Sequence, residues 1–80
     1  MDSKIAVVAI IVSDITSVDK INTLLHDFGE YIIGRMGIPY KEKKVNVISI
    51  VIDAPQTVIN SLSGKLGMIN GVSSKVLTTK

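Results

Sequence analysis

Two segments of this chain, residues 4–13 and 45–53, are largely apolar and rich in β-branched residues. Runs of this length and composition predict β-strands. Because side chains alternate between the two faces of a strand, both faces of each segment are apolar and both need cover. A chain of 80 residues has little interior in which to supply that cover. The two segments are therefore expected at the centre of a sheet that also has a partner.

The segments between and after these strands follow in an alternating order. Residues 17–32 carry apolar side chains at helical spacing, which predicts an amphipathic helix with Thr16 as its N-cap. Residues 33–40 contain two glycines and a proline, which are typical of an edge strand. The polar Lys-Glu-Lys-Lys run that follows predicts a hairpin turn.

A second helix and a fourth strand complete the chain. Pro55 is placed where a helix begins, and an apolar stripe follows it at helical spacing. Gly64 interrupts this stripe, and tight packing of the helix at that point is the expected reason. Asn70-Gly71 supplies a turn, and residues 72–79 read as a last, more polar strand.

The predicted order β-α-β-β-α-β defines an α+β, ferredoxin-like two-layer sandwich with an antiparallel four-stranded sheet. This topology places the first and third strands at the centre and the second and fourth at the edges. The first and third segments are the most apolar, whereas the other two carry Gly, Pro, Ser, Thr and Lys. Composition and topology agree, and residues 1–80 are expected to form a single domain.

An assembly through the sheet is expected as well. Two helices cover one face of a four-stranded sheet, and the other face would expose a contiguous apolar patch. The chain has no cysteine, so disulfides are excluded as a source of stability. The sequence therefore predicts a homodimer or homotetramer that associates through the sheet.

Charge and hydropathy narrow the functional classes. The net charge is +2, and the short Lys run reads as a solvated turn, so nucleic-acid binding is an alternative and not the main expectation. The apolar run of residues 5–12 is far shorter than the roughly 20 residues of a membrane-spanning helix. Met1-Asp2-Ser3-Lys4 lacks the pattern of an export signal. A cytoplasmic protein is expected.

No catalytic set is visible, and no cofactor or metal is expected. His26 is the one histidine, and its position off the apolar stripe of the first helix places it on the surface. Ser63-Gly64-Lys65-Leu66-Gly67 fails the Walker pattern because Leu66 follows the lysine. The chain is expected not to be an enzyme, with a small dimeric ferredoxin-like enzyme as the alternative.

Two stretches carry a family resemblance. The first runs from Leu24 through Arg35-Met36-Gly37-Ile38-Pro39, and the second includes Ser63-Gly64-Lys65-Leu66-Gly67 and ends near residue 72. Together they resemble the regulators of iron-only hydrogenase systems, over nearly the whole chain. The resemblance implies an ACT-like domain similar to the C-terminal domain of nickel-responsive repressors. The nickel site of those repressors needs Cys and several His, which this sequence lacks.

The same resemblance implies a regulatory module with a small-ligand site at a subunit boundary, near the first strand–helix turn. Here that turn contains Ser13, Asp14 and Thr16, whose oxygens and helix-start amides would favour an anion. Arg35 could add a charge-assisted contact from the following strand. The structural alternative is that Asp14 and Thr16 cap the helix and that Arg35 makes an ordinary surface pair.

Overall fold

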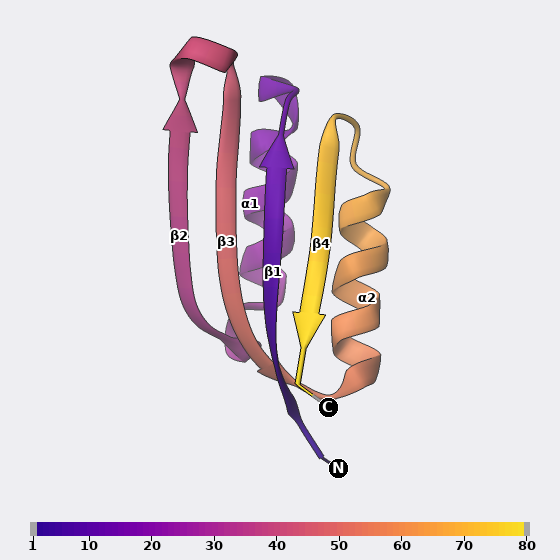
Figure 1. The fold of residues 1–80 in the computed structure, drawn as a ribbon. Coiled ribbons are helices and arrows are strands. Elements are labelled where there is room, and N and C mark those ends of the chain that lie inside the picture. The colour runs from indigo at the N-terminus through magenta and orange to yellow at the C-terminus, as the bar shows by residue number, and fades with distance from the viewer. Residues whose placement is uncertain (1, 80) are drawn as a thin grey trace.

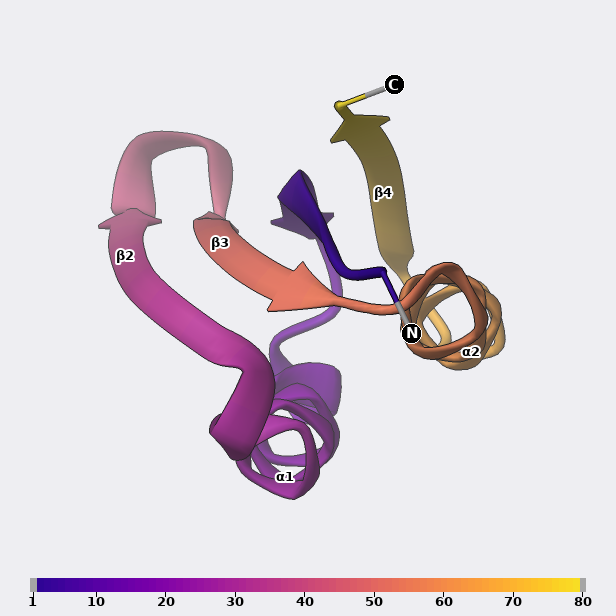
Figure 2. The same cartoon turned by 90° about the horizontal axis from the view of Figure 1, so that it is seen from below.

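Four antiparallel strands form one sheet in the order β2-β3-β1-β4. The computed structural model describes residues 2–79. The two helices lie on one face of the sheet, and the other face is uncovered (Figures 1 and 2). The strands are β1 (Lys4–Val12), β2 (Ile32–Tyr40), β3 (Val45–Ala54) and β4 (Val72–Thr78), and the helices are α1 (Val18–Asp27) and α2 (Gln56–Gly67), with 3-10 turns η1 (Ile15–Ser17), η2 (Gly29–Tyr31) and η3 (Lys41–Lys43).

This arrangement confirms the ferredoxin-like α+β fold predicted from the sequence. The two most apolar strands, β1 and β3, are central and pair antiparallel from Lys4 opposite Ala54 to Val12 opposite Asn46. The Gly- and Pro-containing β2 and the more polar β4 are the edges. Pro39 is tolerated on β2 because an edge strand leaves one side without a neighbour.

The core lies between the sheet and the helices. One face of each central strand is buried, while its other face is largely open to solvent. The apolar stripes of the helices pack against the buried face, as the helical spacing predicted. The buried apolar side chains are Ala6, Val8, Ile10 and Val12 of β1, Ile48, Ile50, Ile52 and Ala54 of β3, Ile21 and Leu25 of α1, and Ile59, Leu62 and Leu66 of α2.

Helix α1 differs from its prediction at both ends. Its N-cap is Ser17, one residue later than predicted, because the short turn η1 precedes it. Its last residue is Asp27 and not residue 32, because Phe28 leaves the helical conformation (φ −98°, ψ 13°) and the turn η2 follows. The apolar period continued to Ile32, but Ile32 is the first residue of β2. Because β2 begins at Ile32, the helix has to end before that residue.

The tight packing expected at Gly64 is absent. A Cβ built on Gly64 would have no neighbouring heavy atom within 4 Å, and the residue is exposed. Gly64 is therefore not required by a close contact within this chain.

The uncovered face of the sheet carries exposed apolar side chains from all four strands. It carries the odd-numbered residues of β1 and β3, and the cross-strand register places side chains of β2 and β4 beside them. Among the strand residues that the structure describes, Asp53 and Lys75 are the charged side chains on this face. Its large exposed apolar members are Ile5, Val7, Ile11, Met36, Ile38, Tyr40, Val47 and Leu77.

Candidate functional site

The turn between β1 and α1 is joined to the turn that precedes β4. The Ser13 amide and hydroxyl both donate to the Gly71 carbonyl, at 2.8 and 3.1 Å. The Ser17 hydroxyl donates to the Asn70 carbonyl at 2.7 Å. The Asn70 amide group donates to Asp14 Oδ2 at 3.3 Å. Segments more than fifty residues apart therefore hold each other in place.

Gly71 is required at this junction. Its φ is +74°, a left-handed conformation that L-residues with a Cβ rarely adopt. An added Cβ would also lie 2.5 Å from the Cβ of Asp14. Both the backbone conformation and the close approach to Asp14 exclude a larger residue.

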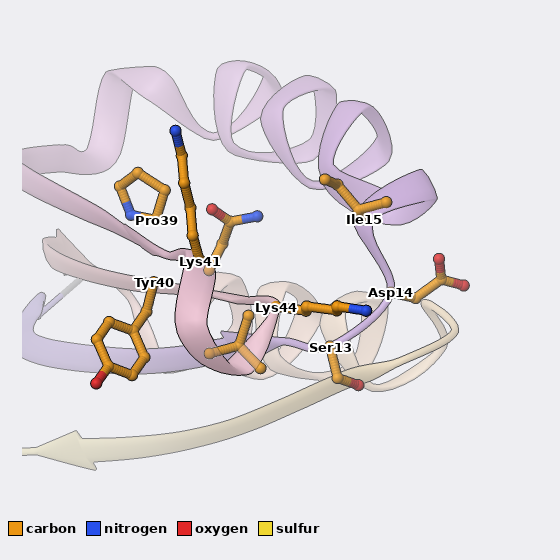
Figure 3. A pocket seen from close by; sticks show the side chains of 9 residues that line it. Ser13, Asp14, Ile15, Pro39, Tyr40, Lys41 and Lys44 are labelled. Atoms are coloured by element: carbon orange, nitrogen blue, oxygen red, sulfur yellow. The ribbon is translucent and has the colours of Figure 1, made fainter.

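A cavity of about 540 Å³ opens next to this junction, where the β2–β3 hairpin faces the β1–α1 turn (Figure 3). This volume is within the roughly 300–1,000 Å³ of small-molecule sites. Most of its wall is apolar, with a small number of polar groups. The lining residues are Ser13, Asp14 and Ile15 from the turn and Pro39, Tyr40, Lys41, Lys44, Val45 and Asn46 from the hairpin.

Two lysines give the hairpin side of the cavity a positive charge. Lys41 and Lys44 begin and end the tip of the hairpin, and both are exposed. Lys44 has a left-handed backbone (φ 55°, ψ 41°), which turns the chain from η3 into β3. In Figure 3 its side chain extends toward the turn that carries Ser13 and Asp14, whereas Lys41 extends on the side of Pro39.

Asp14 provides the negative group on the opposite side. Its Oδ1 accepts from the Thr16 hydroxyl at 2.6 Å and from the Thr16 amide at 3.0 Å. These bonds hold the pKa of Asp14 below its usual value. Desolvation opposes them with a smaller effect, and Asn70 and Lys20 lower the pKa by smaller amounts still. The carboxylate is therefore ionised at neutral pH.

The structure brings together some of the residues predicted as ligand contacts. Ser13 and Asp14 line the cavity, and Thr16 lies beside it, hydrogen-bonded to Asp14. Arg35 lies elsewhere: it donates to Asn22 of α1 at 2.6 Å and lines a separate groove of about 230 Å³. The helix-start amides are also engaged, since Thr16 N donates to Asp14 Oδ1 and Ser17 N to the Asp14 carbonyl.

The hairpin residues of the cavity were not among the predicted contacts. The run Lys41–Lys44 was interpreted as a solvated turn, and these lysines are indeed exposed. The same turn closes a cavity because it lies opposite the β1–α1 turn in the folded chain. No local sequence pattern indicates that position. A hairpin that carries several lysines next to Tyr40 was the only signal in the sequence.

Further properties of the chain bear on other kinds of site. Within residues 2–79, no three His, Cys, Asp or Glu side chains lie close enough together to hold a metal. His26 is exposed in the last turn of α1. None of the helices in the described part of the chain is long and apolar enough to cross a bilayer.

The sheet order and the two helices on one face define a ferredoxin-like α+β domain. The chain belongs to the family described as "TM1266-like: Iron-only hydrogenase system regulator, putative", which matches residues 4–76. The resemblance seen in the sequence is thereby confirmed. A search of the curated proteins finds no match.

Solved structures agree with this family and fold. The chain is similar to the uncharacterized protein TM1266 from Thermotoga maritima, with a TM-score of 0.94, 34% identity, and coverage of 99% of this chain and 100% of that one. It is also similar to part of a formyltetrahydrofolate deformylase from Pseudomonas putida KT2440, with a TM-score of 0.60 and 13% identity. That match covers 92% of this chain but 28% of the deformylase, and it shows the shared fold alone.

Proposed function

We propose that this chain is a cytoplasmic, non-enzymatic regulatory module of an iron-only hydrogenase system, ACT-like in that it binds a small anionic ligand and acts as a homo-oligomer. The observation that carries the proposal is the largely apolar cavity between the β1–α1 turn and the β2–β3 hairpin. A pocket with apolar walls and few polar groups is the usual form of a small-molecule site. Ser13 and Asp14, two of the four predicted contacts, are in its wall.

A regulatory role is favoured over catalysis by His26, because that histidine lies away from the cavity. His26 is in the last turn of α1, whereas the cavity lies beside the start of that helix (Figure 3). A general base must reach the proton that it abstracts, and His26 is at the wrong end of the helix for this cavity. The family description supports the same role.

Association through the sheet is supported by its uncovered face. Apolar side chains from β1, β2, β3 and β4 form one surface there, and Leu77 is 74% exposed. Patches of this kind on a small protein mark an interaction site. A second copy of the chain, packed face to face, would remove this surface from water.

Native mass spectrometry of the protein purified from its own host tests both parts of the proposal. The expected result is a dimer or tetramer that retains a small molecule, which is released on denaturation. A monomer with no added mass at micromolar concentration would contradict the proposal.

A further inference from the structure

The charges around the cavity restrict which anion it can take, provided that the cavity is the ligand site of the proposed function. Lys41 and Lys44 are on one side and Asp14 on the other. The ammonium group of neither lysine forms a hydrogen bond or an ion pair with a residue between 2 and 79. The cavity therefore has two cations that no neighbouring carboxylate neutralises.

The carboxylate of Asp14 has little capacity left for a ligand. A carboxylate has about four lone-pair positions, and Asp14 accepts hydrogen bonds from the Thr16 hydroxyl, the Thr16 amide and Asn70. An ammonium group in the cavity would find at most one free acceptor position on Asp14 and would face two lysines of like charge. The arrangement disfavours a zwitterion such as a free amino acid.

The backbone around the cavity disfavours a phosphate. Phosphate sites are commonly built from several free backbone amides that converge on the anion. Here the Ser13 amide donates to Gly71, the Thr16 and Ser17 amides donate to Asp14, and the Lys44 amide donates to the Lys41 carbonyl. The donors that remain include the two lysine side chains, which can bind a single carboxylate.

The apolar part of the wall requires an apolar ligand body. Ile15, Pro39, Tyr40 and Val45 supply it, and Ile15 is 77% exposed although it is a large aliphatic side chain. A ligand that covers Ile15 would remove this surface from water.

We infer that the cavity binds an organic monocarboxylate with an apolar body and without an ammonium group, and that Lys44 and Lys41 hold its carboxylate. The apolar body lies against Ile15, Pro39, Tyr40 and Val45. Asp14 shapes the wall and takes no part in holding the charge. The oxygens of a carboxylate are suitable acceptors for lysine ammonium groups.

A titration series on the whole protein tests the ligand class. Isothermal titration would compare straight-chain carboxylates from butanoate to nonanoate and 3-phenylpropanoate with three analogues: phenylalanine, 3-phenylpropanamide and phenyl phosphate. At least one carboxylate should bind, and the amide and the amino acid should bind at least about tenfold more weakly, the loss expected for a charge-assisted contact. Tighter binding of phenylalanine, the amide or phenyl phosphate would overturn the inference.

Variants of the hairpin test the role of the lysines. Lys44→Gln and Lys41→Gln should each lower the affinity for the best-binding carboxylate by about tenfold. Lys43→Gln is the matched control, because Lys43 is in the same turn and does not line the cavity. The affinity of this variant for the carboxylate should equal that of the wild type. Equal affinity in all four proteins would overturn the inference, and so would an equal loss in all three variants.

The outcomes separate this inference from the proposed function. If no carboxylate binds but the protein from its host retains a different small molecule, the inference fails and the proposed function stands. If nothing binds and nothing is retained, both fail.

Discussion

At the scale of single residues, Gly71 is the position with the least freedom. Gly71→Ala is expected to lower the free energy of unfolding by at least about 2 kcal/mol, because the left-handed conformation alone costs an L-residue about 1–2 kcal/mol and the added Cβ meets Asp14. Gly64→Ala is the control. Its added Cβ would have no neighbouring heavy atom within 4 Å, and the substitution should stabilise α2 by up to about 1 kcal/mol. Urea unfolding of both variants checks this. Equal effects of the two substitutions would show that the junction at Gly71 is not constrained.

Asp14 is expected to contribute to the pH dependence of stability. Its pKa is lowered in the folded chain, chiefly by the Thr16 hydroxyl, so its stabilising effect is present above the usual value of 3.8 and is lost as the pH falls through the lower folded value. The difference in unfolding free energy between wild type and Asp14→Asn should be constant above about pH 5 and should shrink at lower pH. Urea unfolding across this range measures it, and a difference that does not change with pH would contradict the expectation.

At this scale the sequence indicated Asp14 and Thr16 but not how the side chains around them are arranged. Asp14 and Thr16 were predicted both as ligand contacts and as a cap, and they do bond to each other. Arg35 was grouped with them because β2 follows α1 in the chain. On β2, however, Arg35 is the cross-strand partner of Ile50. It therefore lies on the helix side of the sheet, where it donates a hydrogen bond to Asn22. Which face a residue of an edge strand occupies depends on the register, and the bulge between Ile32 and Gly34 shifts that register.

At the scale of elements, β3 offers a direct test of the two faces of the sheet. Ile50 is fully buried under the helices, and the adjacent Val51 faces the uncovered side. Ile50→Lys should abolish folding, since an unpaired charge in the core is costly. Val51→Lys should keep the circular dichroism spectrum of the wild type but dissociate the proposed oligomer. Light scattering over a dilution series measures this. A Val51→Lys protein that dissociates at the same concentration as wild type would exclude association through this face.

The strands were predictable because their evidence is local. The alternation of the two faces of β1 and β3, and the Gly and Pro of β2, are visible in consecutive residues. The end of α1 was not predictable in this way: Leu25, Phe28 and Ile32 keep helical spacing, yet the chain turns at Phe28. The cavity was not predictable for the same reason. Its two walls, at residues 13–15 and 39–46, meet only in the folded sheet.

At the scale of the whole molecule, specific binding of nickel or zinc is not expected. The chain has one histidine and no cysteine, and the described residues hold no cluster of metal-binding side chains. These metals are usually bound by several nitrogen or sulfur ligands. Isothermal titration with Ni²⁺ and Zn²⁺ should show no stoichiometric site. A sub-micromolar site that is lost in His26→Ala would contradict this expectation.

The central position of β1 also has a consequence for the synthesis of the protein. β1 is synthesised before both of its neighbours, β3 and β4, and β4 follows the other three strands of the sheet. Until residues 72–78 are available, one edge of an apolar strand has no partner, and unpaired apolar edges promote aggregation. The native sheet can therefore form only once residues 72–78 have left the ribosome. A chain that stops before β4 would give an aggregating product and not a smaller folded domain.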